Sequence, residues 1–352
     1  MRKFIELTVS LEKKLRDFTL RAEFSLQDEV FALLGASGCG KSMTLKCIAG
    51  IERPDKGRIV LDGKVLFDHE QGIDLPPQQR QIGYLFQNYA LFPNMTIAEN
   101  LRFVMQGHKA ACTAKLQELL SRFQLNDLKD AYPAALSGGQ QQRAALARIL
   151  AAQAKLLLLD EPFAALDSYL KWQLETELLD ILPSYGGRAI LVSHDRGEVY
   201  RLADKAAIIS QGQMERAQDT KSLFHHPQTL AATLLTGCKN ISRAHRIDNC
   251  HIYAADWDLT LKTAAAPSPQ VKYTAIRAHF LVAQKTPTGK NVFPMEVVRV
   301  IEDTFSVIIM VRPRGKTVRP LRWELPKEHW QELNAGELYL CLPPEQLMLL
   351  HS

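Results

Sequence analysis

Apolar runs alternate with stretches of helical periodicity over the first two thirds of the chain. Residues 30–34, 156–159 and 189–192 are each continuously apolar, as strands buried on both faces are. Residues 18–24 alternate apolar and polar positions, which predicts a half-buried strand, and residues 97–150 have a helical pattern. Strands that alternate with helices in this way predict an α/β fold with a parallel sheet covered on both faces.

Turn signals mark one hairpin early in the chain and many turns in its last third. Residues 58–66 predict a hairpin that turns at Asp62-Gly63. In the last third, short alternating segments such as 251–261 and 271–283 are separated by clusters of Pro, Gly, Asn and Lys, with little helical pattern. Short strands between such turns predict a small β-barrel or sandwich.

The change in pattern predicts two domains. We expect an α/β domain over residues 1–237, with a helical subdomain at about 88–155, and a β domain over residues 238–352. A length of 352 residues agrees with two domains at ~150 residues each.

Composition excludes several classes of protein. The chain is 46% hydrophobic and 23% charged, as ordinary globular proteins are, and its net charge of +5 is too small to indicate nucleic-acid binding. The six cysteines are scattered without a C-x-x-C motif, so neither a zinc site nor a disulfide framework is expected. Glu6 and Glu12 interrupt any signal-peptide core, and no run reaches the ~18 apolar residues of a membrane span. We therefore expect a cytosolic chain that reaches a membrane only through a partner.

A glycine-rich loop follows the first buried run and precedes a helical stretch. Its residues are Gly35, Ala36, Ser37, Gly38, Cys39, Gly40, Lys41 and Ser42, and Met43 follows in the helix. This G-x-x-x-x-G-K-[ST] pattern, between a strand and a helix, predicts a loop whose backbone N–H groups hold phosphates. Lys41 is expected to reach the β- and γ-phosphates, and the Ser42 hydroxyl to bind Mg²⁺. A glycine-rich turn with a chance lysine is the alternative.

Two carboxylates end the apolar run at residues 156–159. Asp160 is expected at the carboxyl end of the strand near the metal, and Glu161 is placed to polarise an attacking water. Taken alone, the pair could equally mark the exit of a strand into a solvated loop. After a phosphate-binding loop in the same sheet, it predicts the second half of a nucleotide site.

The segment Leu136, Ser137, Gly138, Gly139 and Gln140 is the most specific motif. Ser137 predicts a helix N-cap whose glycines expose backbone donors to an anion, although a plain capped helix explains the same residues. The segment resembles the LSGGQ signature of the ATP-binding cassette (ABC) family, whose members are P-loop ATPases with a RecA-like core and a helical subdomain. That resemblance implies that Ser137 and Gly139 contact ATP held by a second copy, in a homodimer with two composite sites.

The other family motifs follow in order along the chain. Gln87 resembles the glutamine that links Mg²⁺ and water to the membrane partner, and His194 the switch histidine at the γ-phosphate. Ala165, Leu166 and Asp167 resemble the loop that runs between the two sites. The resemblance thus implies Glu161, His194 and Gln87 as catalytic residues, and Ser42, Gln87 and Asp160 as Mg²⁺ ligands.

Two ATP-binding positions are less regular. The family often stacks adenine on an aromatic residue, but residues 9–17 contain no Tyr or Trp. Phe18 is the nearest candidate, with a core strand position as the alternative. Because helix N-termini lower the pKa of thiols, we expect Cys39 to be an accessible thiol that ATP protects from alkylation.

Segments after Gln87 and His194 resemble bacterial importer ATPases. The resemblance implies integral-membrane permease subunits as partners, an extracytoplasmic oxyanion-binding protein acting indirectly, and a peripheral location on the cytoplasmic face of the inner membrane. A soluble cassette ATPase acting on DNA or ribosomes would need a long coiled coil or a second cassette, and neither is present in the sequence. A binding module that does not hydrolyse ATP would lack Glu161 or His194.

The tail suggests the cargo. Residues 288–298 resemble the start of the mop fold of molybdate importer ATPases, a small OB-like β-barrel of the mop/TOBE type. Thr288, Lys290 and Asn291 are therefore a possible regulatory oxyanion site. Molybdate is the first expectation for the cargo; sulfate or thiosulfate, tungstate, ferric iron and polyamines are alternatives. A purely structural dimer brace is the alternative for the tail itself.

Overall fold

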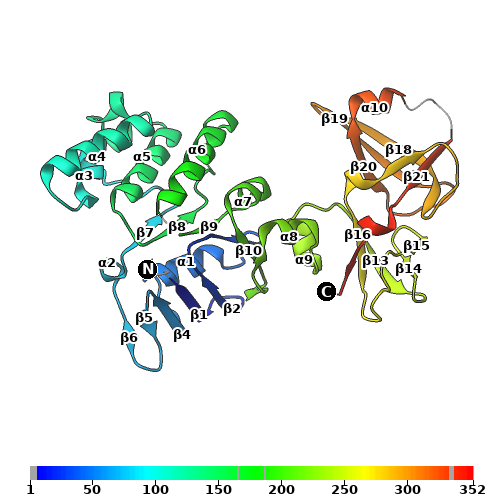
Figure 1. The fold of residues 1–352 in the computed structure, drawn as a ribbon, viewed down its shortest axis with the longest axis horizontal. Coiled ribbons are helices and arrows are strands. Elements are labelled where there is room, and N and C mark those ends of the chain that lie inside the picture. Colours follow the sequence, from blue (N-terminus) through cyan, green and yellow to red (C-terminus); the bar gives the residue numbers. More distant parts are fainter. Residues whose placement is uncertain (1–5, 165, 186–187, 333–336, 352) are drawn as a thin grey trace. The chain divides into compact units, whose positions relative to one another are not determined.

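The structure is a computed structural model that describes residues 6–164, 166–185, 188–332 and 337–351. It divides into two compact units, Met1–Thr220 and Lys221–Ser352 (Figure 1). The division falls before the predicted boundary at residue 237. Arg277 of the second unit donates hydrogen bonds to the carbonyls of Phe224 and Thr236, so the segment before residue 237 is tied to the C-terminal strands. Such long-range bonds leave no local signal in the sequence.

The first unit is built on buried parallel strands. Neighbouring strands run in the order β10 (Lys205–Ser210), β3 (Val30–Leu34), β9 (Ala189–Val192), β8 (Leu156–Asp160) and β7 (Ile82–Leu85). Every residue of β3, β8 and β9 is buried, as their unbroken apolar sequences predicted. Because the strands are parallel, their carboxyl ends lie at one edge of the sheet, where β3 and β8 deliver the two predicted nucleotide motifs.

Antiparallel strands extend this sheet. They are β1 (Leu7–Lys14), β2 (Thr19–Leu26), β4 (Lys56–Leu61), β5 (Lys64–Asp68) and β6 (Ile73–Asp74), with the short β11 (Gln213–Met214) and β12 (Gln218–Asp219) beside β10. The predicted hairpin is confirmed: Asp62 and Gly63 join β4 to β5 with φ of 55° and 75°. Positive φ at both central residues gives a turn whose twist matches that of the strands.

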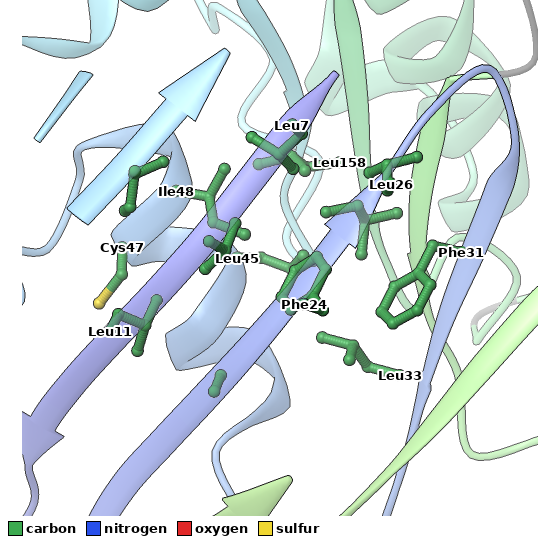
Figure 2. Packing of buried hydrophobic residues seen from close by; sticks show 14 of the residues in the cluster. Leu7, Leu11, Phe24, Leu26, Phe31, Leu33, Leu45, Cys47, Ile48 and Leu158 are labelled. Carbon is green, nitrogen blue, oxygen red and sulfur yellow. The ribbon is translucent and has the colours of Figure 1, made fainter. Parts of the chain in front are cut away.

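The core of this unit forms around helix α1 (Lys41–Ala49), which follows the glycine-rich loop. Its Leu45 and Ile48 are fully buried and belong to one cluster with Leu11 of β1 and Leu158 of β8 (Figure 2). Burial raises the pKa of the Cys47 thiol on the same helix to about 12. Packing on both sides therefore holds the first turn of α1, which carries Lys41 and Ser42, in place against the sheet.

Helices account for the rest of the unit. The predicted helical stretch is confirmed as α3 (Ile97–Val104), α4 (Lys109–Arg122) and α5 (Gly138–Ala151), which contact one another and gather at one end of the unit (Figure 1). The remaining helices of this unit are α2 (Pro77–Arg80), α6 (Ser168–Ile181) and α7 (Arg196–Leu202). Within the described ranges, no helix is long and apolar enough to cross a membrane.

The second unit is mainly β. After α8 (Thr220–His225) and α9 (Leu230–Leu235), its described residues form two five-stranded sheets and a short helix, α10 (Lys327–Glu332). One sheet contains β13 (Asn240–Arg246), β14 (His251–Ala254), β15 (Leu259–Lys262), β16 (Tyr273–Ile276) and β22 (Met348–Leu350). The other contains β17 (Val282–Gln284), β18 (Val292–Glu302), β19 (Ser306–Pro313), β20 (Leu321–Pro326) and β21 (Leu338–Cys341).

The strand pattern of the second unit differs from the prediction in two of the alternating segments. Residues 271–283 form β16, a 3-10 turn at Ala278–Phe280 and β17, and these two strands belong to different sheets. Residues 251–261 form the hairpin β14–β15 rather than one strand, because Trp257 in the connecting turn is buried in the core and Asp258 has a φ of 51°. The alternation of apolar residues runs through this turn and conceals it. Closure into a barrel of the mop type remains a prediction.

Candidate ATP-binding and hydrolysis site

The glycine-rich loop connects β3 to α1, the context that the sequence predicted. Gly40 caps α1 with a φ of 112°, a conformation that side chains with a Cβ rarely adopt. A Cβ on Gly35 would lie 2.4 Å from the Ile209 carbonyl oxygen and 2.5 Å from Cys39 Sγ. Both positions therefore require glycine, and the loop's path places its N–H groups at the start of a helix, where phosphate binds well.

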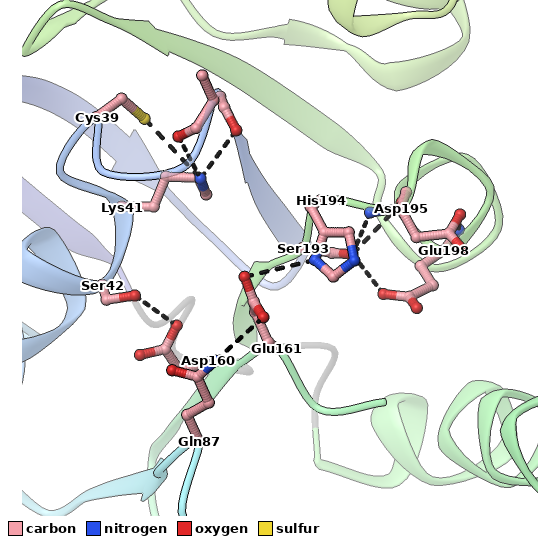
Figure 3. Close-up of polar contacts among 12 residues, drawn as sticks. Cys39, Lys41, Ser42, Gln87, Asp160, Glu161, Ser193, His194, Asp195 and Glu198 are labelled. Carbon is pink, nitrogen blue, oxygen red and sulfur yellow. Dashed lines mark hydrogen bonds and ion pairs between the residues drawn. The ribbon is translucent and has the colours of Figure 1, made fainter. Parts of the chain in front are cut away.

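Lys41 lies inside this loop. Its side chain is 6% exposed, and its Nζ donates to the carbonyl oxygens of Gly35 at 2.8 Å and Ala36 at 2.9 Å (Figure 3). The ammonium group is thus held at the centre of the loop by backbone oxygens, which an arriving phosphate would replace with stronger charge-assisted bonds.

Asp160 and Ser42 meet at the carboxyl end of β8. The Ser42 hydroxyl donates to Asp160 Oδ1 at 2.8 Å, and the hydroxyl of Tyr84 on β7 donates to Asp160 Oδ2 at 2.9 Å. Burial and the neighbouring carboxylate raise the pKa of Tyr84, so its hydroxyl stays a donor. Sequence reasoning missed Tyr84, because its contact with Asp160 depends on the pairing of β7 with β8.

Glu161 brings the three predicted catalytic side chains together. Its Oε2 lies 3.4 Å from Nε2 of Gln87, and its Oε1 lies 3.4 Å from Nδ1 of His194 (Figure 3). Its backbone has a φ of 50° and its N–H bonds the Val192 carbonyl at 2.9 Å. The Glu161 backbone is therefore fixed in a strained conformation. Its carboxylate makes only long contacts, so it can still move towards a substrate.

These residues line a cleft of about 530 Å³. It is bounded by the glycine-rich loop, by Gln87, Glu161 and His194, and by Leu15, Met43 and Lys46. Phe18, the expected adenine contact, is not among its described lining residues. The turn between β1 and β2 bonds Leu15 N–H to the Phe18 carbonyl at 2.8 Å, and the Phe18 ring packs on the core and on Gly212. This turn therefore directs Leu15 towards the cleft instead.

The accessible thiol expected at Cys39 is wrong. Cys39 is 7% exposed, and its Sγ lies between the backbone at Gly35 and Lys41 Nζ, which is 3.9 Å away. The glycine-rich loop covers the Cys39 side chain. The position of Cys39 at the start of a helix was therefore not enough to predict that its thiol is exposed. We expect slow alkylation of Cys39 with or without ATP.

The loop that carries His194 is supported by an ion-pair network that the sequence did not reveal. Asp195 caps α7, and Lys171 of α6 contacts Asp195 at 2.5 Å and Glu198 at 2.6 Å. Burial alone would lower the pKa of Lys171, but its hydrogen bonds to the two carboxylates outweigh burial and raise it. Glu198 also accepts a hydrogen bond from Ser193, next to the histidine. The network leaves the His194 side chain 68% exposed towards solvent.

The predicted signature segment begins α5 and lies on the surface. Ser137 and Gln140 form a reciprocal capping box, so the capping prediction is confirmed. Ser137 and Gly138 are exposed, Leu136 is buried, and a Cβ on Gly139 would lie 3.1 Å from Leu166. Within the described part of the chain, none of these residues lines the cleft.

The neighbouring loop at residues 165–167 is only partly described. Asp167 caps α6 by accepting from the N–H groups of Tyr169 and Leu170, both at 3.0 Å. Leu166 N–H bonds the Phe163 carbonyl at 3.3 Å. Ala165 lies outside the described residues, so its predicted role stays a prediction.

Arg148 connects the signature helix to the loop after Gln87. Arg148 is buried, with 8% of its surface exposed. Its guanidinium donates hydrogen bonds to the carbonyls of Ala90 at 2.7 Å and Tyr89 at 3.1 Å. The same group lies 5.2 Å from the centre of the Phe92 ring. Tyr89 and Ala90 have φ of 62° and 45°, which alanine and tyrosine rarely adopt. Arg148 is thus a positioning residue for the Gln87 loop, and sequence reasoning missed it.

Replacing Arg148 with methionine is expected to leave ATP affinity unchanged and lower kcat about tenfold, because the Gln87 loop loses two charge-assisted hydrogen bonds. Steady-state ATPase kinetics and nucleotide titration check this. Arg143→Met is a matched control on the same helix, since Arg143 bonds the Phe123 carbonyl, far from Gln87 in sequence. An unchanged kcat in Arg148→Met would contradict the assignment.

The possible oxyanion site in the tail is less open than expected. The Asn291 side chain is 8% exposed and bonds Lys262 N–H at 2.7 Å, the Lys262 carbonyl at 2.8 Å and the Leu342 carbonyl at 3.0 Å. Thr288 contacts Thr286 at 2.8 Å, and Lys290 is exposed. The Asn291 amide is therefore committed to bonds with Lys262 and Leu342 and is not available to an anion.

A buried parallel sheet, a glycine-rich loop with Lys41 and Ser42, and a neighbouring strand that ends in Asp160 and Glu161 define a P-loop nucleoside triphosphatase. The ABC transporter family profile matches residues 21–164. The sulfate/thiosulfate import ATP-binding protein CysA of Burkholderia mallei is 38% identical, covering 95% of this chain and 96% of that protein. The chain therefore belongs to the ABC transporter family, and it is the ATP-hydrolysing subunit of an importer.

Other comparisons cover a smaller share of the chain. The Fe(3+) ions import ATP-binding protein FbpC of Haemophilus influenzae is 40% identical over 64% of this chain and 65% of its own length. The dimeric structure of the ATP-binding cassette MJ0796 in a post-hydrolysis state with ADP and Pi has a TM-score of 0.52 at 26% identity, covering 61% of this chain and 98% of that one.

Proposed function

We propose that this chain energises uptake of a tetrahedral oxyanion, with sulfate or thiosulfate as the cargo. The observation that carries this proposal is the match to the CysA protein of Burkholderia mallei, which runs over 95% of the chain and so includes the second unit. Molybdate, suggested by residues 288–298, is the second candidate, since it is also a tetrahedral dianion.

The active form we propose is a homodimer with two composite ATP sites. The cleft of one copy supplies Lys41 and the loop amides, while Ser137, Gly138 and Gly139 of the other copy close over the γ-phosphate. Exposure of the signature segment away from the cleft of its own chain supports this arrangement, as does the dimer of the cassette MJ0796. A single chain would thus bind ATP in an incomplete site.

Mg²⁺ fits the donors at the end of β8. The Ser42 hydroxyl and a buried Asp160 carboxylate are hard oxygen ligands 2.8 Å apart, and Asp160 has no cationic partner among the described residues. Ser42, Asp160 and Gln87 would hold the ion, which would supply charge neutralisation at the phosphates. Asp160 and Tyr84 also keep the Ser42 side of the cleft ordered through their own hydrogen bonds.

Hydrolysis follows from the placement of Glu161. Its carboxylate accepts a proton from the attacking water, Gln87 and His194 orient the water and the γ-phosphate, and Lys41 stabilises the charge on the phosphate oxygens. Closure around ATP moves the Gln87 loop, and the permease at the cytoplasmic face of the membrane would respond to that movement. The chain would then bind the membrane peripherally, through the permease.

Arginine at Gly138 is expected to spare ATP binding by the single chain and to block dimer closure. Gly138 is exposed, and a Cβ there has nothing within 4 Å, so the variant keeps the Ser137 cap and the fold. Ser137→Arg should behave alike, with a further ~1 kcal/mol loss of helix stability from the missing cap. Nucleotide titration and light scattering with ATP measure both effects. ATP hydrolysis at the wild-type rate would contradict the composite site.

Transport by the native complex tests the cargo. A tagged chain is purified with its permease from its own membranes, placed in proteoliposomes and supplied with ATP and the matching binding protein. We expect accumulation of labelled sulfate or thiosulfate, and none with Glu161→Gln. Uptake of molybdate alone would transfer the assignment to the second candidate, and uptake of ferric iron or polyamine alone would overturn the oxyanion proposal.

A further inference from the structure

His194 lies in the short loop 193–195, after β9 has ended at Val192 and before α7 begins at Arg196. Its side chain is largely exposed, and the contact between its Nδ1 and Glu161 Oε1 is long, at 3.4 Å. A side chain with so little support of its own takes its position from the backbone that carries it. The bonds that hold this loop therefore decide where the imidazole lies.

The residues on both sides of His194 are hydrogen-bonded to each other and to α7. Glu198 of α7 is buried and accepts a hydrogen bond from the Ser193 hydroxyl (Figure 3). The Oγ atom of Ser193, which is also buried, accepts from the Asp195 N–H at 2.9 Å. The Asp195 carboxylate accepts from the Gly197 N–H at 2.7 Å. The loop backbone is thus held before and after the histidine.

One ammonium group neutralises both carboxylates of this arrangement. Lys171 Nζ lies 2.5 Å from Asp195 Oδ2 and 2.6 Å from Glu198 Oε1. Burial acts to raise the pKa of Asp195, but hydrogen bonds from Lys171 and from the Gly197 N–H outweigh burial and lower it. Two carboxylates that share one cation repel each other when the cation is removed, and a buried carboxylate without a partner is costly. The geometry of the loop therefore depends on Lys171.

Lys171 is itself held by the first turn of α6. Asp167 caps this helix, and the Lys171 N–H bonds the Asp167 carbonyl at 2.9 Å. Leu174 and Leu178, on the following turns of the same helix, are buried. The start of α6 is thus fixed in the first unit, and it presents the ammonium group to the loop 193–195 from a defined position.

We propose that Lys171 is a positioning residue for His194 in ATP hydrolysis. Lys171 is not among the described residues that line the cleft, so it acts through the loop. Its ammonium holds Asp195 and Glu198, and these hold the backbone on either side of the histidine. This role rests on the proposed function, in which His194 orients the γ-phosphate. A misplacement of about 1 Å at such a group can slow a reaction by up to about 100-fold.

Methionine at position 171 removes the charge and keeps a long apolar side chain. In the full-length protein we expect kcat to fall about tenfold while the KM for ATP stays within about twofold, because Lys41 and the loop amides are untouched. Lys171→Arg should keep kcat within about twofold of wild type, since a guanidinium can bond both carboxylates. Steady-state ATPase kinetics measure both constants, and a thermal melt reports the stability of each variant.

Arg201→Met is the matched control for a general loosening of the two helices. Arg201 of α7 lies 2.6 Å from the buried carboxylate of Glu175 on α6, so this ion pair joins the same helices. Among the described contacts, Glu175 bonds Arg201 and not the loop 193–195. We expect Arg201→Met to lower the melting temperature about as much as Lys171→Met and to leave kcat unchanged. Equal losses of kcat in the two variants would overturn the proposal.

A double-mutant cycle tests whether Lys171 acts through the histidine. His194→Ala should slow turnover, and adding Lys171→Met to it should cause no further loss beyond about twofold. Losses that multiply would overturn the proposal, because Lys171 would then act by another route. A slow His194→Ala beside a fully active Lys171→Met refutes the role of Lys171 alone. A fully active His194→Ala refutes the role of His194 in the proposed function, and that of Lys171 with it.

A second variant covers the case in which Lys171→Met does not fold. Lys171→Met with Asp195→Asn leaves one carboxylate in the network instead of two, and asparagine still caps α7. The same loss of kcat, about tenfold, is expected in this double variant, because the ammonium that held the loop is missing. Turnover at the wild-type rate would overturn the proposal.

Discussion

Glutamine at position 161 is expected to lower ATP turnover by about 100- to 10,000-fold, because the variant cannot accept a proton from the attacking water. ATP binding should be unchanged, since Lys41 and the loop amides are untouched. The substitution is isosteric, and the φ of 50° and the bond to the Val192 carbonyl belong to the backbone. ATP-bound dimers should therefore accumulate and elute as such in gel filtration.

Two comparisons make this result specific. Glu70→Gln changes an exposed carboxylate outside the cleft and should leave turnover at the wild-type level. His194→Ala should also slow turnover, because its Nδ1 lies 3.4 Å from the Glu161 carboxylate. Hydrolysis by Glu161→Gln at the wild-type rate would remove Glu161 as the base and leave the roles of Gln87 and His194 without support.

Alanine at position 41 is expected to weaken ATP binding about 100-fold, which corresponds to losing about two charge-assisted hydrogen bonds to phosphate. The Lys41 ammonium lies in the loop itself, bonded to the Gly35 and Ala36 carbonyls, where the loop amides would hold the phosphates. Equilibrium titration with a fluorescent ATP analogue measures the affinity.

A loss of ATP affinity in Lys41→Ala is informative only if the variant keeps the wild-type fold. Lys41 is 6% exposed and also bridges the loop, so a thermal melt of the apo variant is needed alongside the titration. Lys56→Ala, an exposed lysine on β4, is the matched control and should change neither measurement. Near-wild-type affinity in a folded Lys41→Ala variant would refute the placement of the phosphates.

The local pieces of the site were predictable because each depends on neighbours in sequence. The glycine pattern that ends in Lys41 and Ser42 needs only a strand before it and a helix after it, and both are present. Asp160 and Glu161 follow an apolar run long enough for one buried strand. The cap at Ser137 needs only Gln140 three residues later.

Contacts between distant segments were not predictable in this way. Tyr84 bonds Asp160, and Arg148 bonds Tyr89 and Ala90, but no periodicity or spacing in the sequence links these residues. The same limit explains Phe18: both Leu15 and Phe18 pack on the core, but of the two only Leu15 is among the described residues that line the cleft. It also explains why the division falls at Thr220 and not at residue 237: a hydrogen bond from Arg277 to the Thr236 carbonyl joins the segment before residue 237 to the second unit.

The sequence by itself determined which chemistry this chain carries: a phosphate loop, a carboxylate pair, a signature segment and β strands in the tail. Periodicity and motif spacing are local properties, so they can be recognised in the amino-acid sequence alone. Only the tertiary structure decided which side chains meet at Glu161 and which helix holds the Gln87 loop. Those outcomes depend on how strands are ordered in a sheet, and burial and hydrogen bonding select that order among segments far apart in the chain.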